Sequence, residues 1–305
     1  MEDIRLLALD IDGTILTGAK KLTVRTQAAI EAAADRGIVL ALVTGRPLRG
    51  LPEELLALRG IRYVITSNGA VTTDLKEGET LRVANLDPET ALEVIKVPRS
   101  HNLICAAFVD GFGYCFPETL ERELKQLQNE GLKAYIRKSR KTTDDLDRVI
   151  RQAEKGVENV WFIAPGRSER DMLSRHIRER WNVRTVLTAK TDVEIGSPTA
   201  DKGLALKELA EQLHIRKEQV MAIGDNGNDL GMLQVAGTAV AMGNAENEVK
   251  EIADIVTESN EKDGAAMVIE KLLREYQGIE LADCFPHIRN SPVFGKQKGK
   301  SIGCP

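Results

Sequence analysis

Short apolar runs alternate with longer amphipathic stretches over the first 80 residues of the chain. The apolar run at residues 6–9 predicts a buried strand, and residues 38–43 and 63–66 predict two more. Between the first two runs, an alanine-rich stretch at residues 23–36 is followed by Gly37, as is typical of a helix. Strands joined through helices in this way indicate a parallel sheet, so the chain begins as an α/β protein.

The same alternation returns near the end of the chain. The expected elements are a helix at 202–213, a strand at 220–223, a short helix at 229–235 and a strand at 238–242. Because both ends of the chain follow one pattern, we expect them to form a single sheet that brackets a separate middle part.

The middle part, roughly residues 83–192, is a looser mixture of strand and helix patterns. Residues 102–117 predict a hairpin and residues 161–163 a further strand. A domain inserted into another domain explains this order better than two tandem domains. We therefore expect a core domain formed by residues 1–82 and 193–278, with the insert at 83–192 as a candidate lid.

The pattern changes again after about residue 278. Residues 279–305 show little periodicity and contain several glycine, proline and lysine residues, so we expect a poorly ordered or surface-wrapping tail. Residues 295–301 look like a Walker A phosphate-binding loop, but Phe294 stands where its first glycine belongs and only four residues follow Ser301. We interpret this segment as a solvated basic tail.

The composition limits the class of protein. The 305 residues are 42% hydrophobic and 29% charged, as in a folded globular protein. A net charge of -4 and a pI near 5.8 give no basic footprint for nucleic acid. No apolar run approaches the roughly 18 residues that span a bilayer, and no signal peptide precedes the first strand. We therefore expect a cytoplasmic protein with no membrane or nucleic-acid partner. The four cysteines and four histidines have no zinc-ligand spacing.

Two carboxylates stand at the end of the first apolar run. Asp10 and Asp12 are separated by one residue and followed by Gly13 and Thr14. Alternate side chains of a strand share a face, so both acids reach one site, while the glycine allows a sharp turn. Negative charge at the end of a buried strand is costly unless a cation or ligand compensates it. The placement therefore predicts a functional site.

Polar residues also follow three other core strands that the pattern predicts. These groups are Thr44-Gly45-Arg46, Ser67-Asn68-Gly69 and Gly224-Asp225-Asn226-Gly227-Asn228-Asp229. The carboxyl ends of parallel strands meet at one edge of a sheet, where open α/β proteins bind ligands. We therefore expect all four polar groups to converge on one site.

The last of these groups contains a second pair of acids. Asp225 and Asp229 lie four residues apart in a glycine-containing loop that enters a helix, and both can approach the same point as Asp10. Such hard oxygen ligands suit Mg²⁺, which also keeps waters and substrate phosphate as ligands. The alternative is a loop that only caps the helix, and the presence of Asp10 and Asp12 disfavours it. The sequence therefore predicts Mg²⁺ as the cofactor.

A cluster of acids repels phosphate unless donors and cations balance it. The sequence supplies Thr44 and Asn68 at loop positions and Lys202 at the start of a helix. The Lys202 ammonium group and the helix N-terminus can face the same anion. A lone lysine is more commonly a solvated surface charge, but its position directly after the insert favours phosphate binding.

With these motifs in this order, the chain resembles the haloacid dehalogenase (HAD) superfamily and, within it, the Cof-like (type IIB) phosphatases. The matching strings are Asp10-x-Asp12-Gly13-Thr14, Thr44-Gly45-Arg46, Lys202-Gly203 and Gly224-Asp225-x-x-Asn228-Asp229, with Ser67-Asn68-Gly69-Ala70 as a Cof-type string. The resemblance covers about residues 4–275. It implies an α/β fold in which an α/β cap domain is inserted into a Rossmann-like parallel-sheet core.

The resemblance also implies Mg²⁺-dependent hydrolysis of small phosphate monoesters, either sugar phosphates or other phosphorylated metabolites. Asp10 would attack phosphorus and form an aspartyl-phosphate, while Asp12 would protonate the leaving oxygen and then activate water. Asp12 must then begin protonated, so we expect its site to raise its pKa. Charge on the transferring phosphoryl group would be neutralised by Mg²⁺, Thr44 and Lys202.

Each motif residue thus has an expected role. The expected metal ligands are Asp10, Asp12, Asp225 and Asp229, the phosphate-binding residues are Thr44, Asn68 and Lys202, and the substrate-orienting residues are Gly45, Arg46 and Asn228. The expected partner is a small phosphorylated metabolite, and the expected assembly is a monomer or a weak homo-oligomer.

Two other functions stay open. Phosphomannomutase-type enzymes share the Asp-x-Asp-Gly-Thr string and move phosphate within a sugar by the same chemistry, whereas the full fourth motif favours hydrolysis. The third hypothesis is a non-catalytic sensor of phosphorylated ligands. The intact acids and Lys202 argue against it. The cap, which determines the substrate, is the part whose sequence is least informative.

Overall fold

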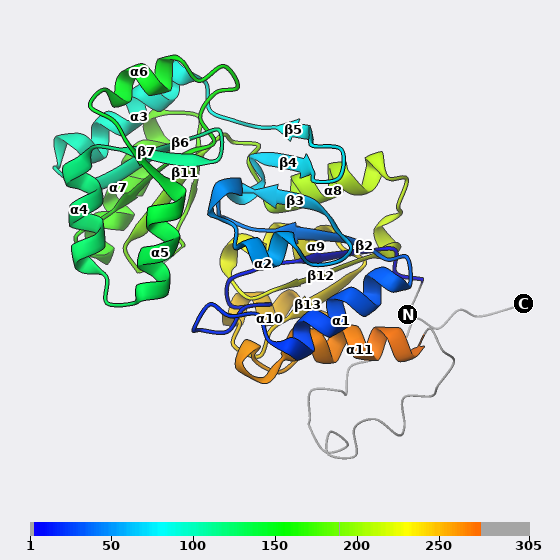
Figure 1. Ribbon diagram of the computed structural model, residues 1–305. Coiled ribbons are helices and arrows are strands. Elements are labelled where there is room, and N and C mark those ends of the chain that lie inside the picture. Colours follow the sequence, from blue (N-terminus) through cyan, green and yellow to red (C-terminus); the bar gives the residue numbers. More distant parts are fainter. Residues whose placement is uncertain (1–2, 189, 276–305) are drawn as a thin grey trace, which may run out of the picture.

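The computed structural model describes residues 3–188 and 190–275. Two β-sheets with their helices form two lobes, which Figure 1 shows side by side. The larger sheet combines strands from both ends of the chain, and the smaller one is built from the middle. The tail expected at residues 279–305, with its Walker-like segment, lies outside the described residues.

The core sheet has eight strands in the order β14-β13-β12-β1-β2-β3-β4-β5. They are β1 (Leu6–Leu9), β2 (Val39–Val43), β3 (Ile61–Thr66), β4 (Val71–Asp74), β5 (Glu79–Val83), β12 (Val220–Gly224), β13 (Thr238–Ala241) and β14 (Ile255–Val256). β1 pairs in parallel with β2 on one side and with β12 on the other, so that Ala8 lies between Ala41 and Ala222. The two ends of the chain therefore form one sheet, as predicted, while β4 and β5 add an antiparallel edge.

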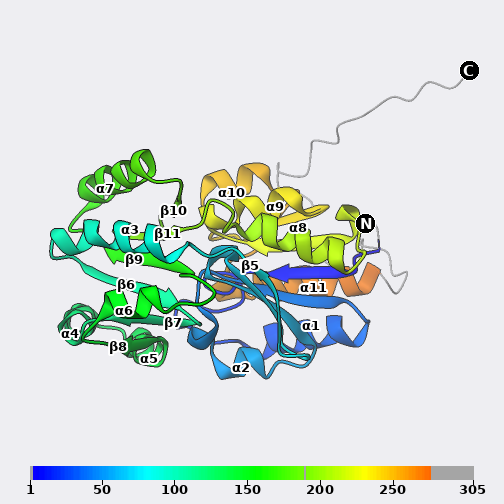
Figure 2. The ribbon, with the colours of Figure 1, turned by 90° about the horizontal axis from the view of Figure 1, so that it is seen from above.

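Helices cover both faces of this sheet. They are α1 (Val24–Asp35), α2 (Glu53–Leu56), α8 (Lys202–Gln212), α9 (Leu230–Val235), α10 (Asn247–Ile252) and α11 (Gly264–Glu275). Figure 2 shows α8, α9 and α10 on one side of the sheet and α1, α2 and α11 on the other. Burial on both faces explains why β1 is a continuous apolar run: all four of its residues are buried.

The first helix begins where the sequence predicted. The Thr23 hydroxyl accepts a hydrogen bond from the Thr26 amide, which satisfies one of the unpaired donors of the first turn of α1. Ala29, Ile30 and Ala33 form its buried face. The helix ends before Gly37, whose φ of 78° lies in the left-handed region that glycine tolerates.

The second sheet has six strands in the order β10-β11-β9-β6-β7-β8. They are β6 (Ile104–Val109), β7 (Phe112–Cys115), β8 (Arg140–Thr142), β9 (Asn159–Ile163), β10 (Arg184–Val186) and β11 (Asp192–Gly196). The predicted hairpin is confirmed as β6 and β7, and the strand expected at 161–163 is confirmed as β9. Because β11 belongs to this sheet, the second lobe extends past the boundary expected at residue 192.

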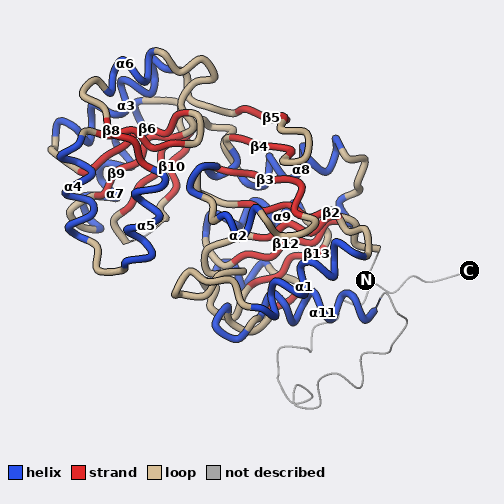
Figure 3. Tube along the Cα trace, in the orientation of Figure 1, coloured by secondary structure: helices blue, strands red, loops and turns tan. Residues whose placement is uncertain are grey.

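This lobe, called the cap below, also carries helices on both faces of its sheet. They are α3 (Pro88–Ser100), α4 (Pro117–Gln126), α5 (Glu130–Ser139), α6 (Leu146–Arg151) and α7 (Arg167–Arg180). Figure 3 shows these helices around the strands of the cap. One apolar cluster joins Phe162 to Ile95 of α3 and Leu173 of α7, and a smaller one joins Phe108 and Trp161 on the opposite face. The cap therefore has a hydrophobic core of its own.

The two connections between the lobes meet at Arg82. Its guanidinium group donates to the carbonyl oxygen of Gly69 and, over 2.7 Å, to that of Thr199, and it pairs with Glu208 at 2.8 Å. The side chain therefore fixes the end of β5 against the segment that leads from the cap into α8. None of the described helices has the length and apolar character needed to cross a bilayer.

Candidate active site

The ends of the parallel core strands form one polar edge of the sheet. Asp10 directly follows β1 and donates its backbone amide to Ile223 of β12 over 3.0 Å. Thr44 directly follows β2 and donates its amide to Ile65 of β3 over 2.8 Å. The carboxyl ends of β1, β2, β3 and β12 are thus tied together, and their polar residues face one region.

Lys202, the first residue of α8, lies between two carboxylates. Its Nζ is 2.8 Å from Asp10 Oδ1 and 2.7 Å from Asp229 Oδ1, and all three side chains are buried. Burial lowers the pKa of Lys202, but the charges of Asp10 and Asp229 outweigh it and raise the pKa. Burial and the charge of Asp229 raise the pKa of Asp10, and Lys202 opposes this rise. The lysine is therefore the central positive charge of the site.

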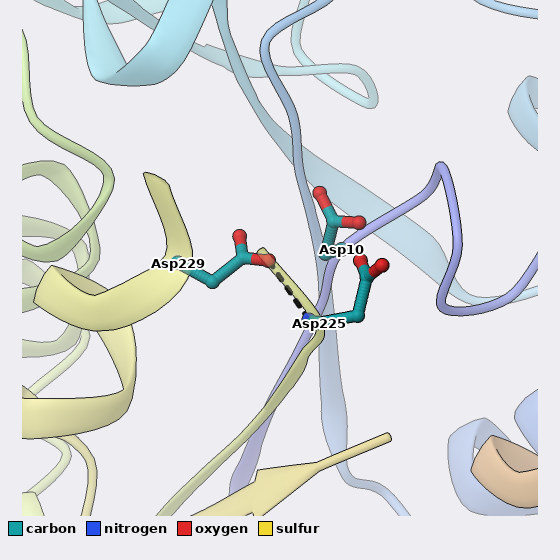
Figure 4. Close-up of side chains that lie close together, drawn as sticks. All are labelled: Asp10, Asp225 and Asp229. Atoms are coloured by element: carbon teal, nitrogen blue, oxygen red, sulfur yellow. Dashed lines mark hydrogen bonds between the residues drawn. The ribbon is translucent and has the colours of Figure 1, made fainter. Parts of the chain in front are cut away.

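Asp225 completes this group of acids, whose carboxyl groups gather at the end of β12 in Figure 4. Thr14 Oγ1 donates to its Oδ1 over 3.3 Å, and Asn244 Nδ2 donates to its Oδ2 over 3.2 Å. Burial and the charge of Asp229 raise the pKa of Asp225 to about 7, against the effect of Lys202. Crowded carboxylates of this kind favour a nearby cation.

The donor set fits a divalent cation. Among the described residues, Asp10, Asp225 and Asp229 each offer an oxygen within 4.8 Å of the others. Both oxygens of Asp229 are firmly held, because Oδ1 accepts from Lys202 and Oδ2 accepts from the backbone amides of Asp225 and Asn226. The two hydrogen bonds to Asp225 are longer, 3.3 and 3.2 Å, and Lys202 contacts Asp10 at Oδ1. Asp10 and Asp225 are therefore the better placed ligands, while Asp229 fixes the lysine and the loop. An all-oxygen set of this kind suits Mg²⁺.

Asp12 points into a different environment from Asp10. Arg46 binds it through two hydrogen bonds of 2.5 and 2.6 Å, and Lys20 Nζ lies 2.7 Å from its Oδ1. Burial raises the pKa of Asp12, but Arg46 and Lys20 outweigh this effect and lower the pKa to about 2. The expectation of a raised pKa is therefore wrong, since two cations hold this carboxyl ionised. Asp12 also lies outside the group of three acids that surround one point.

Arg46 is held by the cap as well as by Asp12. Its guanidinium carbon lies 4.7 Å from the centre of the Tyr135 ring, which α5 brings from the cap. The ring closely approaches Gly50, where a side-chain carbon would lie 2.7 Å from Tyr135 Cε2. One cap helix thus packs against the core segment that follows the second motif.

The segment after β3, Ser67–Gly69, has an unusual backbone. Ser67 and Asn68 have φ values of 49° and 55°, a left-handed conformation that non-glycine residues rarely adopt. The Asn68 amide donates to the Thr44 carbonyl oxygen over 3.0 Å, and Asn68 Oδ1 accepts from Asn228 over 2.9 Å. Asn68 also packs closely against Gly45, where a side-chain carbon would lie 3.1 Å from Asn68 Oδ1. The structure therefore brings the second and fourth motifs together at Asn68, in the Cof-type string.

Position 69 requires a glycine because the backbone just before Lys202 lies against it. Its φ is 93°, and a side-chain carbon at this position would lie 2.3 Å from the carbonyl oxygen of Asp201, immediately before α8. We expect Gly69→Ala to lower the free energy of unfolding by more than about 2 kcal/mol, because it combines backbone strain with a steric clash. Gly78→Ala is the matched control, since Gly78 has a φ of 71° but open space around it.

Denaturant unfolding of both variants measures the difference. Only the conformational cost of about 1–2 kcal/mol is expected for Gly78→Ala. Equal losses in the two variants would contradict the close approach between Gly69 and the start of α8.

Sequence reasoning missed four polar residues of this region. Asn244 follows β13 and also donates to the Gly13 carbonyl oxygen over 2.9 Å, so the rule that located the other strand-end residues applies to it too. Lys20, Glu158 and Glu194 gave no such signal. They lie in a loop and in the cap, and only the fold brings them to Asp12, Ser67 and Asn68.

Comparison with known proteins identifies the family. A family model described as haloacid dehalogenase-like hydrolase matches residues 7–269. The chain belongs to this family. The phosphatase YwpJ of Bacillus subtilis is 28% identical over 286 residues, which cover 88% of this chain and 100% of YwpJ. The putative phosphatase YxeH of the same organism is 32% identical over 277 residues, which cover 88% and 98% of the two chains.

A solved structure of a haloacid dehalogenase-like hydrolase from B. subtilis has a TM-score of 0.75 at 28% identity, covering 88% of this chain and 100% of that one. These likenesses confirm the resemblance to the HAD superfamily and its Cof-like phosphatases, and the α/β fold with an inserted cap. They also confirm the prediction of a phosphatase. The roles of the individual site residues stay predictions.

Proposed function

We propose that this protein hydrolyses small phosphate monoesters, sugar phosphates or other phosphorylated metabolites, through an aspartyl-phosphate formed on Asp10 and with Mg²⁺ as cofactor. The observation that carries this proposal is the placement of Asp10 at the end of β1, beside Asp225 and in contact with Lys202. The three groups provide a nucleophile, an oxygen ligand and a positive charge at one point. The family supports it, as do the relatives YwpJ, named a phosphatase, and YxeH, named a putative phosphatase.

The proposed reaction has two steps. An Asp10 oxygen attacks phosphorus, the bond from phosphorus to the leaving oxygen breaks, and Asp12 gives that oxygen a proton. Water then attacks the same phosphorus, returns a proton to Asp12 and releases inorganic phosphate, which restores the Asp10 carboxylate. Lys202, Thr44 and Asn68 would surround the phosphoryl oxygens and stabilise their charge.

The proton on Asp12 places a condition on the first step. In the structure Arg46 and Lys20 keep this carboxyl ionised, with a pKa of about 2. An acid role therefore requires these two contacts to loosen when substrate is bound. Substrate oxygens that draw Arg46 away from Asp12 would have this effect, consistent with the expected substrate-orienting role of Arg46.

Bound Mg²⁺ would neutralise charge between Asp10, Asp225 and the substrate phosphate. Burial and then the negative charge of Asp229 raise the pKa values of both acids, so a cation beside them would favour their ionised forms. We expect excess EDTA to remove hydrolysis of p-nitrophenyl phosphate and added Mg²⁺ to restore it. Full turnover in the presence of EDTA would exclude this metal assignment.

Release of inorganic phosphate tests the reaction class. We expect the purified protein to release one phosphate for each monoester consumed, over a panel of sugar phosphates and phosphorylated cofactors. A phosphomutase would instead convert a sugar phosphate into its isomer without releasing phosphate. Isomer formation alone would overturn the proposal of a hydrolase.

A further inference from the structure

Two acids of the cap hold two consecutive side chains of the core. Glu194, on β11, accepts a hydrogen bond from Asn68 Nδ2, and Glu158, directly before β9, accepts one from Ser67 Oγ. Ser67 and Asn68 are the two non-glycine residues with left-handed backbone conformations in the segment Ser67–Gly69. The cap therefore contacts this core segment where its backbone is most constrained.

Glu194 fixes the orientation of the Asn68 amide. The Nδ2 group donates to Glu194, so Oδ1 is directed to the other side, where it accepts from Asn228 Nδ2 over 2.9 Å. An amide without the carboxylate partner can rotate and exchange these two atoms. Rotation would place a donor against the donor of Asn228 and break the link to the fourth motif.

Glu158 ties the same segment to the hairpin of the cap. Its second oxygen accepts from the backbone amide of Gly111 over 2.6 Å, in the turn between β6 and β7, and the residue is 4% exposed. Within the described part of the chain, neither acid forms a salt bridge with a lysine or arginine, although the charge of Lys202 acts on Glu194 from a distance. The hydrogen bonds to the two side chains come from Ser67, Asn68, Gly111 and Thr188. Both carboxylates thus lie at the junction of the lobes, with neutral hydrogen-bond donors around them.

We propose that Glu194 and Glu158 are positioning residues of the cap that hold the segment Ser67–Gly69 so that Asn68 meets the phosphate and Asn228 in one orientation. This inference rests on the proposed function, since Asn68 is a predicted phosphate-binding residue. It makes the cap a part of the phosphate site itself, in addition to any contact that the cap makes with the leaving group.

Glu194→Ala tests the inference, with Glu194→Gln as the conservative variant. The alanine variant frees Asn68, so we expect kcat/KM for p-nitrophenyl phosphate to fall by about 10- to 100-fold, as small displacements of site groups do. The inhibition constant of inorganic phosphate should rise. Glutamine still offers an oxygen to Asn68, so Glu194→Gln should remain close to wild type. The inhibition constant does not depend on the fraction of folded enzyme, so lost stability alone cannot change it.

Asp192→Ala is the matched control. Asp192 lies two positions before Glu194 on the same strand and face, is similarly half-buried, and bonds to Trp161 within the cap. We expect its loss to affect the stability of the cap and to leave the inhibition constant of phosphate unchanged. An equal effect of Asp192→Ala and Glu194→Ala would show that any damage to β11 suffices, which would overturn the inference.

A double-mutant cycle separates action through Asn68 from independent action. We expect Glu194→Ala to have no further effect in an Asn68→Ala background. If the full effect of Glu194→Ala persists without Asn68, the positioning role is wrong. Glu158→Ala and Glu158→Gln should repeat the pattern of the Glu194 pair with Ser67→Ala as background.

Calorimetric titration with inorganic phosphate separates this inference from the proposed function. A wild-type protein that binds phosphate in a Glu194-dependent way without hydrolysing monoesters would overturn the proposed function and keep the positioning role. An active wild type whose Glu194→Ala variant is unaffected would keep the proposed function and overturn the positioning role. A protein that neither hydrolyses monoesters nor binds phosphate would overturn both.

Discussion

Replacing Asp10 with asparagine is expected to abolish both phosphoenzyme formation and turnover. The amide cannot act as the nucleophile, so the first covalent bond to phosphorus does not form. The asparagine side chain would keep an oxygen that can accept from Lys202, whose Nζ lies 2.8 Å from Asp10 Oδ1 in the structure, so the fold should survive. Acid quenching with a labelled monoester measures the phosphoenzyme, and p-nitrophenyl phosphate measures turnover.

Asp12→Asn is the comparison for this variant. It should still form the phosphoenzyme, with turnover reduced by about 10² to 10⁴, the usual contribution of general acid–base catalysis. Thermal unfolding of both variants checks that the loss of activity is chemical. Wild-type turnover of Asp10→Asn would show that the covalent mechanism is wrong.

The central strands of the core were predictable because their burial leaves a local pattern of apolar residues in the sequence. β1 is buried on both faces and therefore reads as an unbroken apolar run. β5 was not predicted, since it is an edge strand whose residues are exposed or only half-buried. β8 and β10 have three residues each, which is too short for a periodic pattern to emerge.

Side-chain partners were less predictable than the positions of the motifs. The strand-end rule brought Asp10, Thr44, Asn68 and Asp225 to one edge without any knowledge of the fold. The pKa of Asp12, in contrast, depends on Arg46, which lies 34 residues away in the sequence and reaches Asp12 only when β1 and β2 pair. Electrostatic surroundings of this kind follow from the fold and cannot be read from spacing.

The contacts between the cap and the site were even less predictable from the sequence. Its hairpin and β9 were predicted, but the contacts that matter for the site come from single residues such as Glu194 and Tyr135. Neither residue stands in a motif or at the carboxyl end of a core strand. Each contacts the core only because the two connections between the lobes, fixed at Arg82, place the cap over the ends of β2 and β3.

We expect Lys202→Met to reduce activity and also to cause the largest loss of folding stability among substitutions in the site. The side chain is 1% exposed and pairs with two buried carboxylates, so its removal leaves Asp10 and Asp229 without their common cation. Breaking a buried ion pair in this way costs about 3–5 kcal/mol. The loss of a donor to the phosphoryl group should reduce kcat by about 10² or more. Lys207→Met is the matched control on the same helix, because Lys207 is exposed and 3.8 Å from its partner Glu211.

The pH dependence of this loss distinguishes lost charge from lost packing. The folded-state pKa of Asp10 is already raised, and removing Lys202 raises it further. Below its unfolded-state pKa, such a carboxyl is protonated in both the folded and the unfolded protein and has no effect on stability. As the pH rises through the folded-state pKa, it destabilises the folded protein. The difference in unfolding free energy between wild type and Lys202→Met should therefore be small near pH 4 and grow toward pH 8. Added Mg²⁺ should reduce the difference at the higher pH by supplying positive charge to Asp10 and Asp225. A difference that is equally large at both pH values would show that Lys202 stabilises the core by packing instead of by charge.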